Sequence, residues 1–165
     1  MIDTPPPTVD SESLRRTYGC FPSGVVALCA HDGRNPIGMA ASSFTSVSLD
    51  PPLVSVCVQD TSTTWPRLRA SRRIGISVLA EGHDDVCMSL SRKDGDRFSG
   101  VEWGAAAEGS VFVHGSTVWL DCVVDKEVEG GDHTIVLFRI LGVQADTTVE
   151  PLVFHGSRFR LLTGA

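Results

Sequence analysis

Short apolar runs rich in valine and isoleucine, separated by turn-forming residues, recur along most of this 165-residue chain. The run at 24–30 is turned by 31–35 into a second run at 36–47. Further runs cover 53–58, 74–79, 152–154 and 158–161. Runs of this length, bounded by Gly, Pro, Asn and Asp, are typical of strands, so the sequence predicts a mainly β domain.

The clearest strand has apolar and acidic residues on opposite faces. The apolar positions are Leu120, Cys122, Val124 and Val128, and the acidic ones are Asp121, Asp125 and Glu127. Side chains of a strand point alternately to its two faces, so this strand is expected to be half buried. Gly130, Gly131 and Asp132 then lead into an apolar strand at 133–143, and the pair is predicted to form a long hairpin.

Three short helices are predicted among the strands: 11–18 with Ser11 as N-cap, 62–70 capped by Ser62 or Thr63, and about 82–90. Many short strands with few helices favour a closed or nearly closed barrel over a doubly wound sheet. We expect a single domain over residues 11–165. Residues 1–10, rich in Pro, Asp and Thr, are predicted to be a disordered tail.

Composition excludes several classes of partner. A net charge of −6 leaves no basic surface for nucleic acid. The chain has no signal-peptide pattern at its start and no run of about 18 apolar residues, so we expect a soluble cytoplasmic protein without membrane contact. The five cysteines lie mostly within apolar runs and show no ligand spacing, so they are interpreted as reduced core residues and no metal site is expected.

The segment 38–53 carries small and hydroxylated residues where a strand usually has bulky apolar ones. Small side chains let a flat ligand approach the backbone, and Ser or Thr hydroxyls can bind its polar edges. A Ser-rich edge strand ending in a Pro-Pro turn is the alternative. Neither a G-x-G-x-x-G nor a G-x-x-x-x-G-K-[ST] motif is present, so a nucleotide would be bound in another way.

Four blocks, in order along the chain, resemble the short-chain flavin reductases with the FMN-binding split-barrel fold. The blocks are 21–26 (FPSGVV), 38–54 (GMAASSFTSVSLDPPLV), 131–133 (GDH) and 151–156 (PLVFHG). These reductases are components of two-component flavin-dependent monooxygenases. The resemblance implies a split-barrel homodimer that reduces FAD or FMN with NADH or NADPH. The reduced flavin then diffuses to a partner monooxygenase, with FAD the favoured flavin.

The resemblance also implies a flavin site. The strand and loop at 40–48 would cradle the isoalloxazine and ribityl chain, with polar contacts from Ser42, Ser43, Ser46 and Ser48. Further positions implied to contact the cofactors are Pro22, Met39, Ala40, Ala41, Val47, Pro52, His155 and Gly156.

Two segments are candidates for binding the flavin phosphates. Ser62 and Thr63 precede a predicted helix, whose N-terminus would offer free N–H groups. Trp65 is either an aromatic wall of the site or a residue that packs on the barrel. The loop 91–98 contains three cations, and the resemblance assigns Arg92 and Arg97 to the phosphates beside Phe98, although an isolated charged loop is more often simply solvated.

His133 follows a Gly-Gly-Asp turn and is expected to project from a rim of the barrel. By resemblance it would contact the nicotinamide, and it is the one residue assigned a catalytic role. The alternative is a turn histidine that meets only water. Hydride transfer between two stacked rings needs no protein nucleophile, which agrees with the lack of a Ser-His-Asp pattern.

Two other functions fit parts of the sequence. A split-barrel protein could bind flavin for electron transfer or storage without rapid turnover, but it would not need the retained Gly131-Asp132-His133 segment. A β-barrel that binds a protein or peptide would be colourless and would have no affinity for flavin.

Overall fold

A computed structural model describes residues 9–163, so residues 1–8 of the predicted tail lie outside the described residues. Its helices are α1 (Ser11–Gly19), α2 (Trp65–Arg69) and α3 (Asp84–Leu90). Its strands are β1 (Ser23–Gly24), β2 (Val26–His31), β3 (Pro36–Ala41), β4 (Thr45–Leu49), β5 (Pro52–Gln59), β6 (Ile74–Val78), β7 (Trp103–Ala105), β8 (Val111–Val113), β9 (Val118–Gly130), β10 (His133–Ala145), β11 (Val153–His155) and β12 (Arg158–Arg160). The prediction of a mainly β domain with a few short helices is confirmed.

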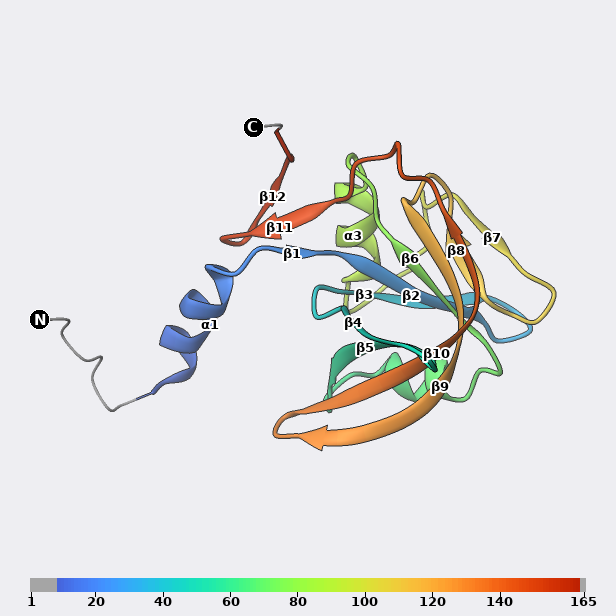
Figure 1. The fold of residues 1–165 in the computed structure, drawn as a ribbon, viewed down its shortest axis with the longest axis horizontal. Helices are drawn as coiled ribbons and strands as arrows, with labels where there is room; N and C mark the ends of the chain where they lie inside the picture. The colour runs from blue at the N-terminus through green and yellow to red at the C-terminus, as the bar shows by residue number, and fades with distance from the viewer. Residues whose placement is uncertain (1–8, 164–165) are drawn as a thin grey trace, which may run out of the picture.

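Seven strands form one antiparallel sheet in the order β3-β2-β6-β9-β10-β5-β4. The sheet curls so that β3, at one edge, contacts β5 near the other edge, which gives the barrel visible in Figure 1. Two small sheets, β1-β11-β12 and β7-β8, lie beside it. No helix in the described part of the chain is long and apolar enough to cross a membrane.

The predicted hairpin is formed by β9 and β10, where His133 pairs with Gly130 across the turn. Two register shifts, at Leu137/Phe138 and at Ile140/Gly142, bend this long pair. β10 also pairs with β5, and His133 lies opposite Gln59 in that ladder. The hairpin therefore places His133 beside the end of β5.

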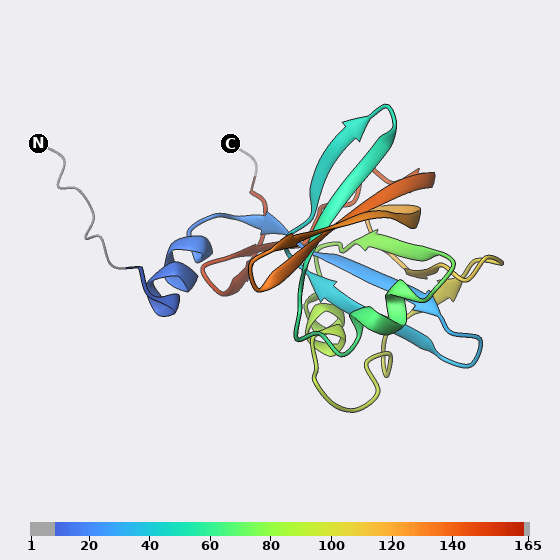
Figure 2. The ribbon, with the colours of Figure 1, turned by 90° about the horizontal axis from the view of Figure 1, so that it is seen from below.

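The prediction of a single strand over residues 36–47 is wrong. β3 ends at Ala41, and the chain crosses to β4 at the other edge of the sheet, as Figure 2 shows. The crossing is held by Ser43, whose hydroxyl accepts a hydrogen bond from the Cys57 amide at 2.9 Å and donates one to the Cys57 carbonyl at 3.0 Å. The side chain thus replaces a strand partner, which apolar periodicity cannot reveal.

Helix starts also differ from the predictions. The N-cap of α1 is Asp10 rather than Ser11, because the Asp10 carboxylate accepts from the Ser13 amide at 2.8 Å. α2 begins only at Trp65, after Thr64, although the Ser62 hydroxyl does accept from the Trp65 amide at 3.1 Å. The small sheet of β7 and β8 was not predicted, since its strands have only three residues each.

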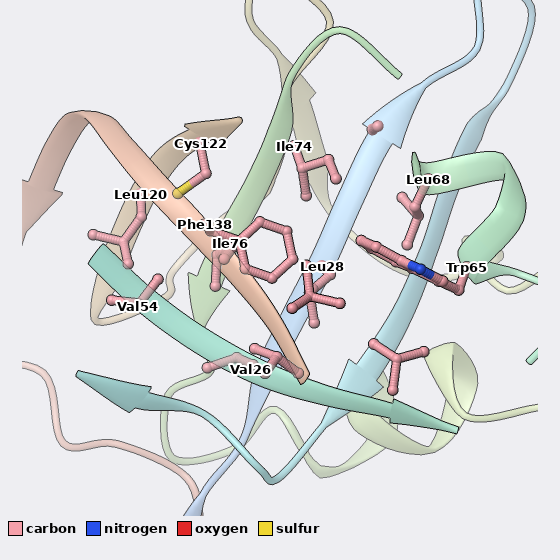
Figure 3. Close-up of a cluster of buried hydrophobic side chains, with 14 of the residues drawn as sticks. Val26, Leu28, Val54, Trp65, Leu68, Ile74, Ile76, Leu120, Cys122 and Phe138 are labelled. Carbon is pink, nitrogen blue, oxygen red and sulfur yellow. The ribbon is translucent and has the colours of Figure 1, made fainter. Parts of the chain in front are cut away.

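β2 lies between two apolar clusters and is buried on both faces. Val26 and Leu28 point into the barrel, where Figure 3 shows them with the fully buried ring of Phe138. Ala27 and Cys29 point outward to a second cluster, which includes Leu90 of α3. Burial raises the pKa of the Cys29 thiol to about 12, so this cysteine is a neutral core residue.

Candidate active site

A cleft of about 820 Å³ opens where the end of β3, the end of β5 and the loop before α2 meet. The loop after α3 and the first residue of β10 complete it. The predicted site residues that line it are Met39, Ala40, Ala41, Ser42, Ser43, Ser62, Thr63, Arg97 and His133. Nine positions chosen from separate parts of the sequence thus lie around one cleft.

The β3 side of the cleft is a wall of small residues. Ala40 and Ala41 are partly buried, and the exposed Ser42 hydroxyl makes no hydrogen bond within residues 9–163. The wall is close to the core because position 38 is glycine, where a Cβ atom would lie 2.7 Å from Cys29 Sγ and 2.9 Å from Phe98 Cζ. A flat ring can therefore approach the β3 backbone, with the Ser42 hydroxyl free to bind it.

Arg97 is the charged group fixed most firmly in the cleft. Its Nη1 donates to the Gly38 carbonyl at 3.0 Å and to the Thr64 hydroxyl at 2.7 Å. Neither Arg97 nor Lys93, which also lines the cleft, takes part in an ion pair within residues 9–163. A guanidinium held by neutral acceptors keeps its charge for an anionic ligand.

The loop before α2 contributes hydroxyl groups rather than a helix terminus. Ser62 and Thr63 line the cleft, but α2 has only five residues, too few for a substantial helix dipole. Any anion bound here would therefore depend on individual donors, chiefly Arg97 and the hydroxyls.

Trp65 lies in the barrel core and does not line the cleft. Of the two roles considered for this residue, the structure therefore supports packing on the barrel. Its ring meets Phe138 edge to face with centroids 6.0 Å apart, and its Nε1 donates to a Glu127 carboxylate oxygen at 3.0 Å. The other oxygen of Glu127 pairs with Arg69 at 2.7 Å. These contacts attach α2 to β9 and so fix Thr64, which in turn holds Arg97.

His133 enters the cleft at the start of β10, and its side chain is 35% exposed. Its Nδ1 lies 2.7 Å from a carboxylate oxygen of Asp132, and this hydrogen bond lowers the pKa of Asp132. Because a carboxylate only accepts, Nδ1 carries a proton in this hydrogen bond, and in the tautomer with its single proton there Nε2 is an acceptor. The pair thus orients the imidazole for a ligand that offers an N–H group.

Ten further predicted site residues do not line this cleft: Pro22, Ser46, Val47, Ser48, Pro52, Trp65, Arg92, Phe98, His155 and Gly156. Phe98 is buried and packs edge to face on Trp103 at 5.9 Å, while Arg92 is exposed. Ser46 to Ser48 belong to β4, and His155 belongs to the small β11-β12 sheet.

Several cleft residues were missed from the sequence. They are Cys57, Gln59, Thr61, Thr64, Leu90, Ser91, Lys93 and Asp94. Cys57 and Gln59 had a usable signal, because they share the face of β5 opposite the buried Val56 and Val58. Lys93 belongs to the charged loop 91–98 that the sequence singled out, but which residues of that loop reach the cleft depends on how α3 packs on the barrel.

Comparison with known proteins decides the family. Residues 18–163 match the family described as flavin reductase like domain. This chain belongs to that family.

Other members of the flavin reductase family align along most of this chain. A flavin reductase of Pseudomonas putida is 35% identical over 148 residues, which cover 89% of this chain and 87% of the relative. The reductase subunit HsaB of a flavin-dependent monooxygenase from Rhodococcus jostii is 31% identical, covering 92% and 77%. The structure of the NADH:FAD oxidoreductase SgcE6 of Streptomyces globisporus C-1027, in complex with NAD and FAD fragments, superposes with a TM-score of 0.88 at 37% identity, covering 93% of each chain.

These relatives confirm the resemblance stated for the four sequence blocks. They also agree with the split-barrel architecture, since solved flavin reductases superpose on nearly the whole chain. The chain is therefore a member of the flavin reductase family by sequence and by fold.

Proposed function

We propose that this flavin reductase binds FAD or FMN in the cleft, reduces it with NADH or NADPH, and releases the reduced flavin to a separate flavin-dependent monooxygenase. The observation that carries the proposal is the cleft itself, which combines the small-residue wall of β3, the unpaired Arg97 guanidinium and the oriented His133 imidazole. Relatives named as reductase subunits of monooxygenases support the choice of partner.

The described residues fit a flavin. Ala40 and Ala41 leave room for a planar ring, and Ser42 offers a hydroxyl to its polar edge. Arg97 and Lys93 would bind the phosphates. When bound, the flavin supplies the hydride-accepting ring, and the protein supplies orientation and a shaped cavity.

His133 would orient the nicotinamide. With Nδ1 bonded to Asp132, its Nε2 can accept a hydrogen bond from a carboxamide N–H. Such a contact positions the ring without transferring a proton. No residue of the cleft has to act as a nucleophile, and Cys57 contributes only a partly buried wall.

The first experiment is NADH oxidation by the purified protein with and without added FAD or FMN, followed by nicotinamide absorbance. We expect rapid oxidation that depends on added flavin. Flavin binding without oxidation would support a storage or electron-transfer protein instead. A colourless protein with neither property would support a barrel that binds a protein or peptide.

Replacing His133 with alanine is expected to raise the KM for NADH or lower kcat, reducing kcat/KM by about tenfold, because one hydrogen bond to the nicotinamide is lost. Flavin affinity, measured by quenching of flavin fluorescence, should stay nearly unchanged. His114, whose ring is tilted by 43° against that of Trp119 and which does not line the cleft, provides the control His114→Ala. Unchanged NADH kinetics in His133→Ala would remove this role.

We also infer a homodimer, because α1 is joined to the rest of the described chain by little more than one hydrogen bond, from the Gly156 amide to the Gly19 carbonyl at 2.9 Å, and leaves large aromatic side chains exposed. No residue of α1 is buried, and Tyr18 and Phe21 are 68% and 77% exposed. Figures 1 and 2 both show α1 standing apart from the barrel. A second copy would cover these aromatic side chains. Light scattering after size exclusion should give twice the chain mass, and a monomer at micromolar concentration would contradict the proposal.

The single domain over 11–165 and a cytoplasmic location remain parts of the proposal. All five cysteines are free thiols, which supports a reducing compartment.

A further inference from the structure

Arg97 is held in the cleft by one of its nitrogens, which leaves the others free. Nη1 donates to the Gly38 carbonyl at 3.0 Å and to the Thr64 hydroxyl at 2.7 Å, and these bonds use both of its hydrogens. Nη2 and Nε make no hydrogen bond within residues 9–163. These two nitrogens carry the parallel N–H groups with which an arginine binds phosphate as a bidentate fork. The partners of Nη1 therefore decide where the fork lies.

The two partners of Nη1 are of different kinds. The Gly38 acceptor is a backbone carbonyl of β3, which any residue at that position would supply. The Thr64 acceptor is a side-chain oxygen, so it depends on the residue type. Thr64 is thus the one side chain in residues 9–163 that holds the guanidinium by a hydrogen bond.

Thr64 is itself firmly fixed. It is 8% exposed, and its carbonyl accepts from the Arg67 and Leu68 amides, both at 3.1 Å, at the start of α2. Leu68 is fully buried in the barrel core, where it lies with Trp65 in Figure 3. Threonine is also stiff at χ1, because its side chain branches at Cβ. The hydroxyl that holds Arg97 therefore has a rigid support.

The chain around Arg97 does not fix the guanidinium in the same way. Arg97 lies between α3 and β7, outside any helix or strand. Its neighbour Phe98 is buried and its amide donates to an Asp96 carboxylate oxygen at 2.9 Å, which anchors the backbone but leaves the long arginine side chain its many rotamers. Asp94 lines the same cleft. A guanidinium released from its neutral acceptors would be free to pair with that carboxylate, at the expense of an anionic ligand.

We propose that Thr64 is a positioning residue for the binding of phosphorylated flavins. Its hydroxyl holds Nη1 of Arg97, so that Nη2 and Nε stay available to the flavin phosphate. The inference rests on the proposed function, because that function places the flavin in the cleft and its phosphate on Arg97. Thr64 thereby contributes to a preference for FMN and FAD over riboflavin, which has the same ring without phosphate.

The test replaces the Thr64 hydroxyl with a methyl group, in Thr64→Val. Affinities for FMN and riboflavin are measured by quenching of flavin fluorescence. We expect FMN binding to weaken by about five- to tenfold, because one hydrogen bond to a charged group is lost, and riboflavin binding to stay unchanged. In an Arg97→Ala background the same substitution should have no further effect on FMN, since the two residues act through one contact. Thr64→Ser keeps the hydroxyl and should recover most of the affinity.

Thr117→Val is the matched control. The Thr117 hydroxyl oxygen is buried, has no hydrogen-bond partner in the described part of the chain and does not line the cleft, so its loss should change neither affinity. Thr64→Ala removes the same hydroxyl as Thr64→Val and provides a second variant if valine does not fold at this position.

Four results would overturn the proposal. Equal weakening of FMN and riboflavin would mean that Thr64 only shapes the cleft, and an unchanged FMN affinity would mean that Gly38 alone suffices to hold Arg97. A full loss of FMN affinity on adding Thr64→Val to Arg97→Ala would mean that the hydroxyl binds the phosphate by itself. A Thr64→Ser variant as weak as Thr64→Val would exclude the hydroxyl as the cause. Failure of the proposed function is distinct, because the wild type itself would then bind neither flavin.

Discussion

Replacing Arg97 with alanine is expected to weaken binding of FMN and FAD by about 10- to 100-fold. One guanidinium contact to a phosphate contributes roughly 1.5–3 kcal/mol, and each 1.4 kcal/mol is a tenfold change in affinity. Arg97 is placed for this contact by Gly38 and Thr64, and no carboxylate in residues 9–163 pairs with it. Flavin fluorescence quenching measures the loss, and the KM for NADH should change far less.

A structural role for Arg97 can be separated from phosphate binding. Riboflavin has the same ring without phosphate, so its affinity should be unaffected by Arg97→Ala if the guanidinium binds phosphate. Arg97→Lys keeps the charge and should recover part of the affinity. Arg92→Ala, in the same loop but outside the cleft, is the matched control. Equal weakening of riboflavin and FMN would show that Arg97 only supports the fold.

The parts of the fold that could be predicted are those that local patterns determine. Alternation along β9 and the Gly130-Gly131-Asp132 turn specify the hairpin directly, and the structure has it. The break after Ala41 could not be seen, because Ser43 bonds to the backbone of Cys57, 14 residues later. The order of strands in the sheet likewise depends on pairings between distant segments, such as β6 with β9.

In the candidate site, too, features set by local sequence could be predicted and features set by contacts between distant segments could not. The small-residue wall at Ala40 to Ser42 could be predicted because unusual composition in a strand is visible without a structure. Two arginines of one loop, Arg92 and Arg97, could not be told apart, since only the contacts of Arg97 with β3 and Thr64 direct it into the cleft. Trp65 is similar, because its Glu127 partner is 62 residues away.

Replacing Gly75 with alanine is expected to destabilise the protein by about 3 kcal/mol. Gly75 is the buried second residue of β6, at a point where β8 packs against the sheet. A Cβ atom at this position would lie 2.2 Å from the Val111 carbonyl oxygen and 2.9 Å from its carbon. Both atoms belong to the backbone, so no side-chain rotation relieves the overlap and β8 has to move, at a cost in the upper range for overpacking.

The sheet provides a closely matched control. Gly142 of β10 pairs with the same residue as Gly75, Asp121 of β9, but on the other side of that strand. Its added Cβ would lie 3.6 Å from Asp121 Cβ, an ordinary contact at an exposed position, so Gly142→Ala should stay within about 0.5 kcal/mol of the wild type. Urea unfolding followed by tryptophan fluorescence measures both variants. Equal stabilities would mean that β8 is not packed on β6 as tightly as Gly75 requires, and the position would then tolerate any small residue.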